Sequence, residues 1–198
     1  MKKLIFILSL CLTQTIHASS ILFLGDSLTE GHGLANEQAY PILVQEFIQK
    51  KLKKDVTIIN GGVSGSTTSD ALARLKWYSR KKPNVIFIAL GANDGLRGLD
   101  LEQSQKNLEK IIEYGKNSKA KVLLAGMMIP PNYGPDYSQK FQQIYKDLGE
   151  KYQLKVMPFL LEGVAGKKEF NQKDGIHPNE LGHKKIAENV FEFLKGEL

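Results

Sequence analysis

The 198-residue chain has one cysteine, Cys11, and one tryptophan, and beyond its first eighteen residues it has no apolar run long enough to span a membrane. A single cysteine excludes an intramolecular disulfide and a zinc finger built on thiolates. Hydrophobic residues make up 42% of the chain and charged residues 24%, which excludes a wholly disordered or fibrous protein. The length suits one domain with a sizeable core.

The first eighteen residues have the three parts of a secretory signal peptide. Two lysines precede the mainly apolar run Leu4–Leu12, and a more polar stretch ends at the small residue Ala18. We predict a signal peptide over residues 1–18 and a single domain over residues 19–198, with cleavage after Ala18 preferred and cleavage after Ser20 as the alternative. Such a leader implies a periplasmic or secreted protein.

The positive charge of the chain is partly a property of this leader. Removal of Lys2 and Lys3 lowers the formal net charge from +6 to +4. The remaining basic clusters, in residues 50–54 and 80–82, fall at predicted helix ends, where the helix dipole favours cations, and no aromatic residues are interleaved with them. We therefore expect no nucleic-acid partner and at most weak contact with an anionic membrane surface.

Strand-like and helix-like segments alternate along the chain, which predicts an α/β fold with a parallel sheet. Continuous apolar runs, rather than alternating ones, indicate strands buried on both faces. The predicted strands are Ile21–Leu24, Val56–Ile59, Val85–Leu90, Val122–Met128 and Leu154–Val156. Between them, Pro41 and Pro178 suit the first positions of helices, and Asp100 suits a helix N-cap.

Three polar loops follow the first three of these strands. They contain Gly25–Ser27, Asn60–Gly65 and Gly91–Asp94. In an open parallel sheet, the loops at the carboxyl ends of the strands build the binding site, so we expect the three loops to converge.

Ser27, His177 and Asp174 are the candidate catalytic residues. A serine is a weak nucleophile until a base takes its proton, and imidazole titrates near neutral pH. Asp174 stands three residues before His177, a spacing that can place both side chains on one turn and let the carboxylate orient the ring. The Gly-x-Ser-x-Gly elbow of another hydrolase fold is absent.

An oxyanion formed at Ser27 needs hydrogen-bond donors. The backbone N–H groups of Ser27 and Gly65 and the side-chain amide of Asn93 are the candidates. Each of these short motifs alone is typical of a turn. Their joint placement at successive strand ends favours a site.

The segments Gly25-Asp26-Ser27-Leu28, Val63-Ser64-Gly65, Gly91-Ala92-Asn93-Asp94 and Asp174-x-x-His177 resemble the four sequence blocks of the GDSL or SGNH hydrolases, in the family's order. The resemblance implies a three-layer α/β/α, flavodoxin-like fold with a central five-stranded parallel sheet and neither metal nor cofactor. It also implies that Ser27 is the nucleophile, His177 the base and Asp174 its orienting partner, with Ser27, Gly65 and Asn93 as the oxyanion hole.

Residues 93–98 and 131–134 are similar to segments of a bacterial periplasmic group within this family, which contains acyl-CoA thioesterases, arylesterases and lysophospholipases. Gly91-Ala92 replaces a common Gly-Gly, and Gly61-Gly62 stands where larger residues often occur. These departures leave the chemistry intact and affect the expected shape of the pocket.

Loop residues after the third and fourth predicted strands are candidates for substrate binding. Leu96, Ile129, Pro130 and Tyr133 could line an acyl groove or simply pack the loops, and Arg97 could bind an anionic head group or be a solvated charge.

His32 and His183 are candidate metal ligands together with His177, but no pair of these histidines has metalloprotease spacing, so we expect no metal.

The sequence thus predicts a serine esterase acting on small-molecule or lipid substrates: aryl and alkyl esters, acyl thioesters and lysophospholipids. One alternative is a carbohydrate O-acetyl esterase of the same family. The other is a non-catalytic flavodoxin-like module that binds phosphate or flavin. The oligomeric state is not predicted.

Overall fold

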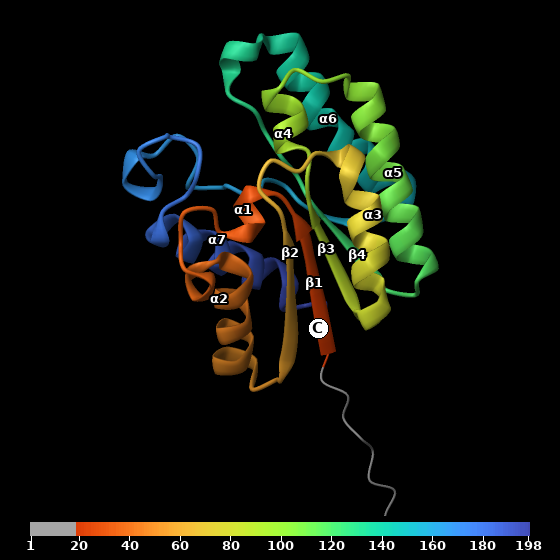
Figure 1. Ribbon diagram of the computed structural model, residues 1–198, viewed down its shortest axis with the longest axis vertical. Coiled ribbons are helices and arrows are strands. Elements are labelled where there is room, and N and C mark those ends of the chain that lie inside the picture. Colours follow the sequence, from red (N-terminus) through yellow and green to blue (C-terminus); the bar gives the residue numbers. More distant parts are fainter. Residues whose placement is uncertain (1–18) are drawn as a thin grey trace, which may run out of the picture.

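A computed structural model describes residues 19–198, so the predicted signal peptide lies outside the described residues. The core of the domain is a five-stranded parallel sheet in the order β2-β1-β3-β4-β5 (Figure 1). The strands are β1 (Ser19–Gly25), β2 (Val56–Gly62), β3 (Val85–Ala89), β4 (Lys121–Ala125) and β5 (Lys155–Met157). All five predicted strands are therefore confirmed. Every residue of β3 is buried, as its continuous apolar run predicts.

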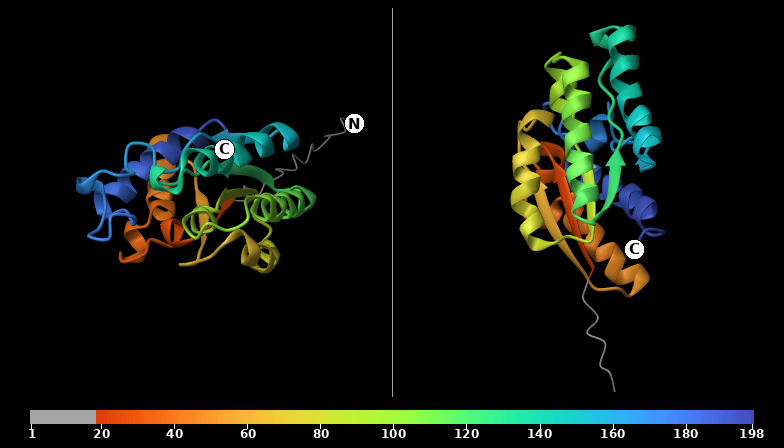
Figure 2. Two further views of the ribbon diagram at one scale, coloured as in Figure 1. Left: turned by 90° about the horizontal axis from the view of Figure 1, so that it is seen from above. Right: turned by 90° about the vertical axis from the view of Figure 1, so that its right-hand side faces the viewer.

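Helices cover both faces of the sheet, which gives three layers. On one face, α2 (Tyr40–Phe47) packs against α7 (Glu180–Leu194). On the other face, α3 (Thr68–Tyr78), α5 (Leu101–Asn117) and α6 (Pro135–Tyr152) lie side by side, as the right-hand view of Figure 2 shows. The predicted three-layer α/β/α fold is confirmed. The apolar stripes of α5 and α6, which include Leu108, Ile111, Phe141 and Ile144, form the core under this face.

Two short helices follow the carboxyl ends of strands. They are α1 (Ser27–Glu30), after β1, and α4 (Ala92–Leu96), after β3, and both lie at the upper end of the sheet in Figure 1. Single turns complete the described elements, at Asn36–Gln38, Ile48–Leu52, Ser79–Lys81, Pro131–Tyr133 and Lys168–Phe170.

The structure confirms one predicted helix start and corrects another. The Asp100 side chain caps α5 by accepting hydrogen bonds from the backbone N–H groups of Glu102 and Gln103. The prediction that Pro178 begins the last helix is wrong. That helix begins at Glu180 and is capped by Asn179, while Pro178 pairs with Asn171 in an antiparallel bridge. The Asn179 side chain accepts a hydrogen bond from Gly182 N and so caps the helix. The helix therefore begins after Asn179, and Pro178 stays in the extended segment before it.

The fourth strand is shorter than its apolar run. The prediction extended it to Met128, whereas β4 ends at Ala125. The backbone N–H of Gly126 donates to Met157 O in β5, and the chain then leaves the sheet toward Pro130. Met128, Ile129 and Pro130 belong to a loop that faces the cavity described below, whereas Met127 is buried in the core. None of the helices in residues 19–198 is both long and apolar enough to cross a bilayer.

Candidate active site

A cavity of about 600 Å³ opens at the carboxyl ends of the strands. The loops after β1, β2, β3 and β4 form its walls together with the segment 159–177 that leads into α7. Apolar groups make up most of its lining. The lining residues include Ser27, Leu28, His32, Ser64, Gly65, Ala92, Asn93, Leu96, Met128, Ile129, Pro130, Phe159, Leu161, Ile176 and His177. The three polar loops expected to converge do so here.

Ser27, His177 and Asp174 form one hydrogen-bonded chain. The Oγ atom of Ser27 lies 3.0 Å from Nε2 of His177, and Nδ1 of the same ring lies 2.8 Å from Oδ2 of Asp174. A carboxylate can only accept, so the ring proton resides on Nδ1, and Nε2 is left to accept from the serine hydroxyl. The arrangement matches a nucleophile, a base and an orienting acid.

Asp174 is held in its ionised form by the backbone around His177. The N–H groups of His177 and Ile176 each donate to its Oδ1 atom at 3.0 Å. The hydrogen bonds from the backbone and then the side chain of His177 lower the pKa of Asp174 from 3.8 to about 2. The carboxylate therefore stays negatively charged beside the ring at neutral pH.

Ser27 is the first residue of α1, and Asp26, which separates it from the end of β1, fixes this turn. The Oδ1 atom of Asp26 accepts from Leu28 N at 3.0 Å, which caps α1. The side chain of Asp26 is completely buried, and its Oδ2 atom has no hydrogen-bond partner among the described residues. Burial raises the pKa of Asp26 from 3.8 to about 6.

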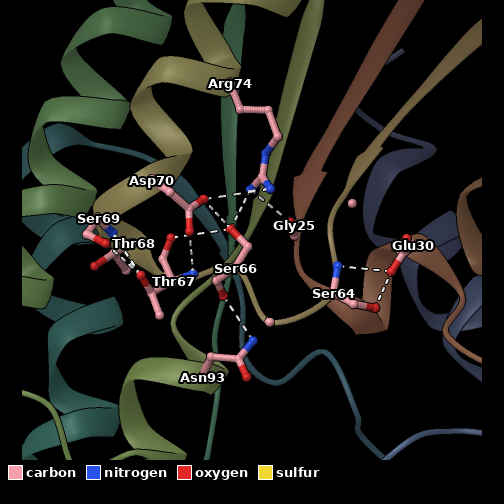
Figure 3. Close-up of polar contacts among 12 residues, drawn as sticks. Gly25, Glu30, Ser64, Ser66, Thr67, Thr68, Ser69, Asp70, Arg74 and Asn93 are labelled. Carbon is pink, nitrogen blue, oxygen red and sulfur yellow. Dashed lines mark hydrogen bonds and ion pairs between the residues drawn. The ribbon is translucent and has the colours of Figure 1, made fainter.

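The candidate oxyanion donors face the same cavity. In the described part of the chain, neither Ser27 N–H nor Gly65 N–H donates a hydrogen bond to another protein group. Gly65 has a φ of +76°, a left-handed conformation that favours glycine. The Nδ2 atom of Asn93 donates one hydrogen to Ser66 O at 2.9 Å (Figure 3), and its second hydrogen remains available. The N–H groups of Ser27 and Gly65 and one amide hydrogen of Asn93 are thus available to an oxyanion in this cavity.

Three of the five predicted substrate-binding residues line the cavity, namely Leu96, Ile129 and Pro130. Tyr133 and Arg97 are not among the lining residues. The Tyr133 hydroxyl donates to Leu96 O at 2.7 Å and so stabilises the backbone of a residue that lines the cavity. The Arg97 guanidinium donates to Gly65 O at 3.0 Å, so it holds the backbone next to a candidate oxyanion donor.

The sequence did not assign several lining residues to the active site, and it considered His32 only as a metal ligand. The ring of His32 lies 4.5 Å, centroid to centroid, from that of His177, and its Nδ1 is 3.2 Å from Ser64 Oγ. Ile176 lines the cavity as an exposed residue beside His177. Only its place inside the Asp174–His177 motif could have indicated this, and no local pattern links His32 to the catalytic serine.

His183 lies apart from the site, on the buried side of α7. Its Nδ1 accepts from Tyr40 N at 3.1 Å, and burial lowers the pKa of His183 to about 4. Within residues 19–198, no group of three or more histidine, cysteine, aspartate or glutamate side chains is arranged to hold a metal ion.

Known proteins resemble this chain over most of its length. The sequence pattern of the GDSL-like Lipase/Acylhydrolase family matches residues 23–185. The chain is 40% identical to an arylesterase of Vibrio mimicus, covering 98% of this chain and 97% of that protein. It is 35% identical to thioesterase 1/protease 1/lysophospholipase L1 of Escherichia coli K12, covering 86% and 81%.

The fold is also that of known esterases. The crystal structure of the psychrotrophic esterase EstA from Pseudoalteromonas sp., inhibited by monoethylphosphonate, superposes with a TM-score of 0.86. That pair is 33% identical, and the match covers 90% of this chain and 98% of the other. The sequence blocks, the sheet order and these likenesses agree, and the chain belongs to the GDSL-like lipase/acylhydrolase family.

Proposed function

We propose that this protein hydrolyses carboxylic esters and thioesters through an acyl-enzyme on Ser27. The observation that carries the proposal is the chain from Ser27 Oγ to His177 Nε2 (3.0 Å) and from His177 Nδ1 to Asp174 Oδ2 (2.8 Å). It lies in a cavity beside the N–H groups of Ser27 and Gly65, which have no acceptor within residues 19–198. Family membership argues for the same chemistry and against the non-catalytic binding module.

The residues divide the reaction as follows. His177 Nε2 takes the hydroxyl proton as Ser27 Oγ attacks the carbonyl carbon, and Asp174 stabilises the resulting imidazolium. The negative oxygen of the tetrahedral intermediate accepts hydrogen bonds from the N–H groups of Ser27, Gly65 and Asn93. The bond to the leaving alcohol or thiol breaks, and His177 supplies its proton. Water, activated by His177, then attacks the acyl group and frees Ser27.

The cavity supports substrates with an apolar acyl or aryl part. Its volume of about 600 Å³ and its mainly apolar lining exceed what an acetyl group alone would fill. We therefore assign aryl and alkyl esters, acyl thioesters and lysophospholipids as the substrate class. Rates for p-nitrophenyl esters from acetate to decanoate test this, because a carbohydrate O-acetyl esterase would prefer acetate.

Replacement of the nucleophile tests the mechanism. We expect Ser27→Ala to abolish p-nitrophenyl butyrate hydrolysis while the circular-dichroism spectrum is unchanged. Ser138→Ala is a matched control, because the Ser138 hydroxyl lies in α6 and makes no hydrogen bond to the described residues. Wild-type turnover by Ser27→Ala would contradict the proposal.

Export from the cytoplasm is a second part of the proposal, with a signal peptide over residues 1–18 and the hydrolase domain over residues 19–198. Cleavage after Ala18 is supported over cleavage after Ser20, because Ser20 N and Oγ both donate to Asn84 Oδ1 at the start of the sheet. The mass of the protein recovered from the periplasm or medium of a bacterial host tests this. We expect a chain that begins at Ser19, and an uncleaved chain in the cytoplasm would contradict it.

A further inference from the structure

Arg74 lies on α3, outside the cavity, yet it connects two parts of the active site. One of its terminal nitrogens, Nη2, donates to Gly25 O at 3.0 Å and to Ser66 Oγ at 2.8 Å (Figure 3). Its side chain is only 13% exposed, and Nη1 lies 3.8 Å from Asp70 Oδ1. A nearly buried cation is therefore bound to the end of β1, two residues before Ser27.

Ser66 passes this contact on to Asn93. The Ser66 hydroxyl donates to Asp70 Oδ1 at 2.5 Å while it accepts from Arg74, so the hydroxyl has a partner on each side. The carbonyl oxygen of the same residue accepts from Asn93 Nδ2 at 2.9 Å. In Figure 3 these contacts form a continuous path from Arg74 through Ser66 to the Asn93 amide.

The path ends on one candidate oxyanion donor, the Asn93 amide, and passes close in sequence to the other two. Gly25 precedes Ser27 by two residues, and Ser66 directly follows Gly65. The Asn93 amide has two hydrogens, and the one engaged by Ser66 determines where the other points. Donors aimed at developing charge lower the barrier only if they are held in place, and a displacement of about 1 Å can cost about 100-fold in rate.

We propose that Arg74 is a positioning residue for the Asn93 donor of the oxyanion hole, because one guanidinium nitrogen binds both the β1 carboxyl end and Ser66, whose carbonyl oxygen holds the amide. This rests on the proposed function, since Arg74 acts through Asn93. Arg74 touches no substrate. Its removal loosens the Asn93 amide, which matters mainly when the oxyanion forms.

A double-mutant cycle between Arg74 and Asn93 tests the proposal with p-nitrophenyl butyrate, well below the melting temperature of every variant. We expect Arg74→Gln to lower kcat by about 10- to 100-fold with KM changed less than about threefold. In an Asn93→Ala background, the same change should lower kcat by less than about threefold. Arg80→Gln, which removes one exposed positive charge near the end of α3, is the matched control and should leave kcat unchanged.

Equal losses of kcat from Arg74→Gln with and without Asn93 would overturn the proposal, because they would show that Arg74 acts independently of the amide. An unchanged kcat in Arg74→Gln would also overturn it. Failure of the proposed function is distinguished from both outcomes by Ser27→Ala, measured in the same series, which would then keep wild-type turnover. If Arg74→Gln does not fold, Ser66→Ala takes its place in the cycle. If it folds, Arg74→Lys, which keeps a donor cation, should lose less activity than Arg74→Gln.

Discussion

The carboxylate of Asp174 binds His177 twice, through the ring and through the backbone. Its Oδ2 atom is 2.8 Å from Nδ1, while Oδ1 accepts from the backbone N–H of His177 at 3.0 Å. One side chain thus fixes both the loop conformation and the ring orientation that aims Nε2 at Ser27. The Asp-x-x-His spacing provides this arrangement because the residues between form a tight turn.

Asp174→Asn should keep much of the geometry and lose most of the activity. The amide can still accept through its oxygen, but it removes the negative charge and can leave the ring in the wrong tautomer. We expect kcat to fall by about 10³- to 10⁴-fold in steady-state ester hydrolysis. As a control, Asp136→Asn removes one carboxylate from the start of α6 and should not change kcat. A loss of less than tenfold in Asp174→Asn would contradict the role given to Asp174.

Asp26→Asn should change how stability depends on pH. Burial raises the folded-state pKa of Asp26 from 3.8 to about 6, so the folded protein binds this proton more tightly than the unfolded chain. The free energy of unfolding therefore falls as pH rises from about 4 to about 6, and the loss persists above pH 6. This group contributes a loss of roughly 3 kcal/mol across that window.

Urea unfolding of both proteins between pH 4 and pH 7 measures this contribution. Asparagine does not titrate, so stability of the Asp26→Asn variant relative to wild type should increase across the window by the amount that Asp26 costs the wild type. Parallel pH profiles for the two proteins would show that Asp26 does not titrate differently in the folded state.

Met128→Glu should select against long acyl chains. Met128 is 38% exposed and lines the cavity, so a charge there reaches the apolar lining without disrupting the core. We expect kcat/KM for p-nitrophenyl octanoate to fall at least tenfold and that for the acetate to change less than threefold. Leu99→Glu is the matched control, since Leu99 is 39% exposed and is not among the lining residues. Equal losses for both esters would place the acyl group elsewhere.

Arg97→Gln separates two roles for a residue that the sequence linked to anionic head groups. Because its guanidinium binds Gly65 O at 3.0 Å, its loss should lower kcat for neutral p-nitrophenyl esters by about three- to tenfold. Measuring KM for an acyl-CoA alongside the neutral ester distinguishes the roles. A raised KM for the acyl-CoA alone, with the neutral ester unaffected, would favour head-group binding.

The sequence was sufficient for the centre of the sheet because β1, β3 and β4 are buried on both faces over most of their length. Continuous apolar runs such as Val85–Leu90 have no competing amphipathic interpretation in an alternating α/β pattern. The ends of elements were harder to predict. Pro178 suits a helix start by its fixed φ, yet the neighbouring Asn179 can cap the helix and does so.

Site residues could be predicted where the interacting residues lie close together in the sequence. Asp174 and His177 share one turn, and Ser27 lies two residues after the last residue of β1, so short motifs marked them. Arg74 acts through contacts 49 and 8 residues away, to Gly25 and Ser66, which no local spacing encodes. The same holds for Arg97, whose hydrogen bond to Gly65 spans 32 residues.

Covalent labelling by a fluorophosphonate tests the central claim most directly, because the probe requires an activated serine beside a base and oxyanion donors. Intact mass and peptide mapping of the wild type should show one adduct, on Ser27. The Ser27→Ala variant should show none, and Ser138→Ala should be labelled like the wild type. An unlabelled wild type, or an adduct on another serine, would contradict the assignment of Ser27 as the nucleophile.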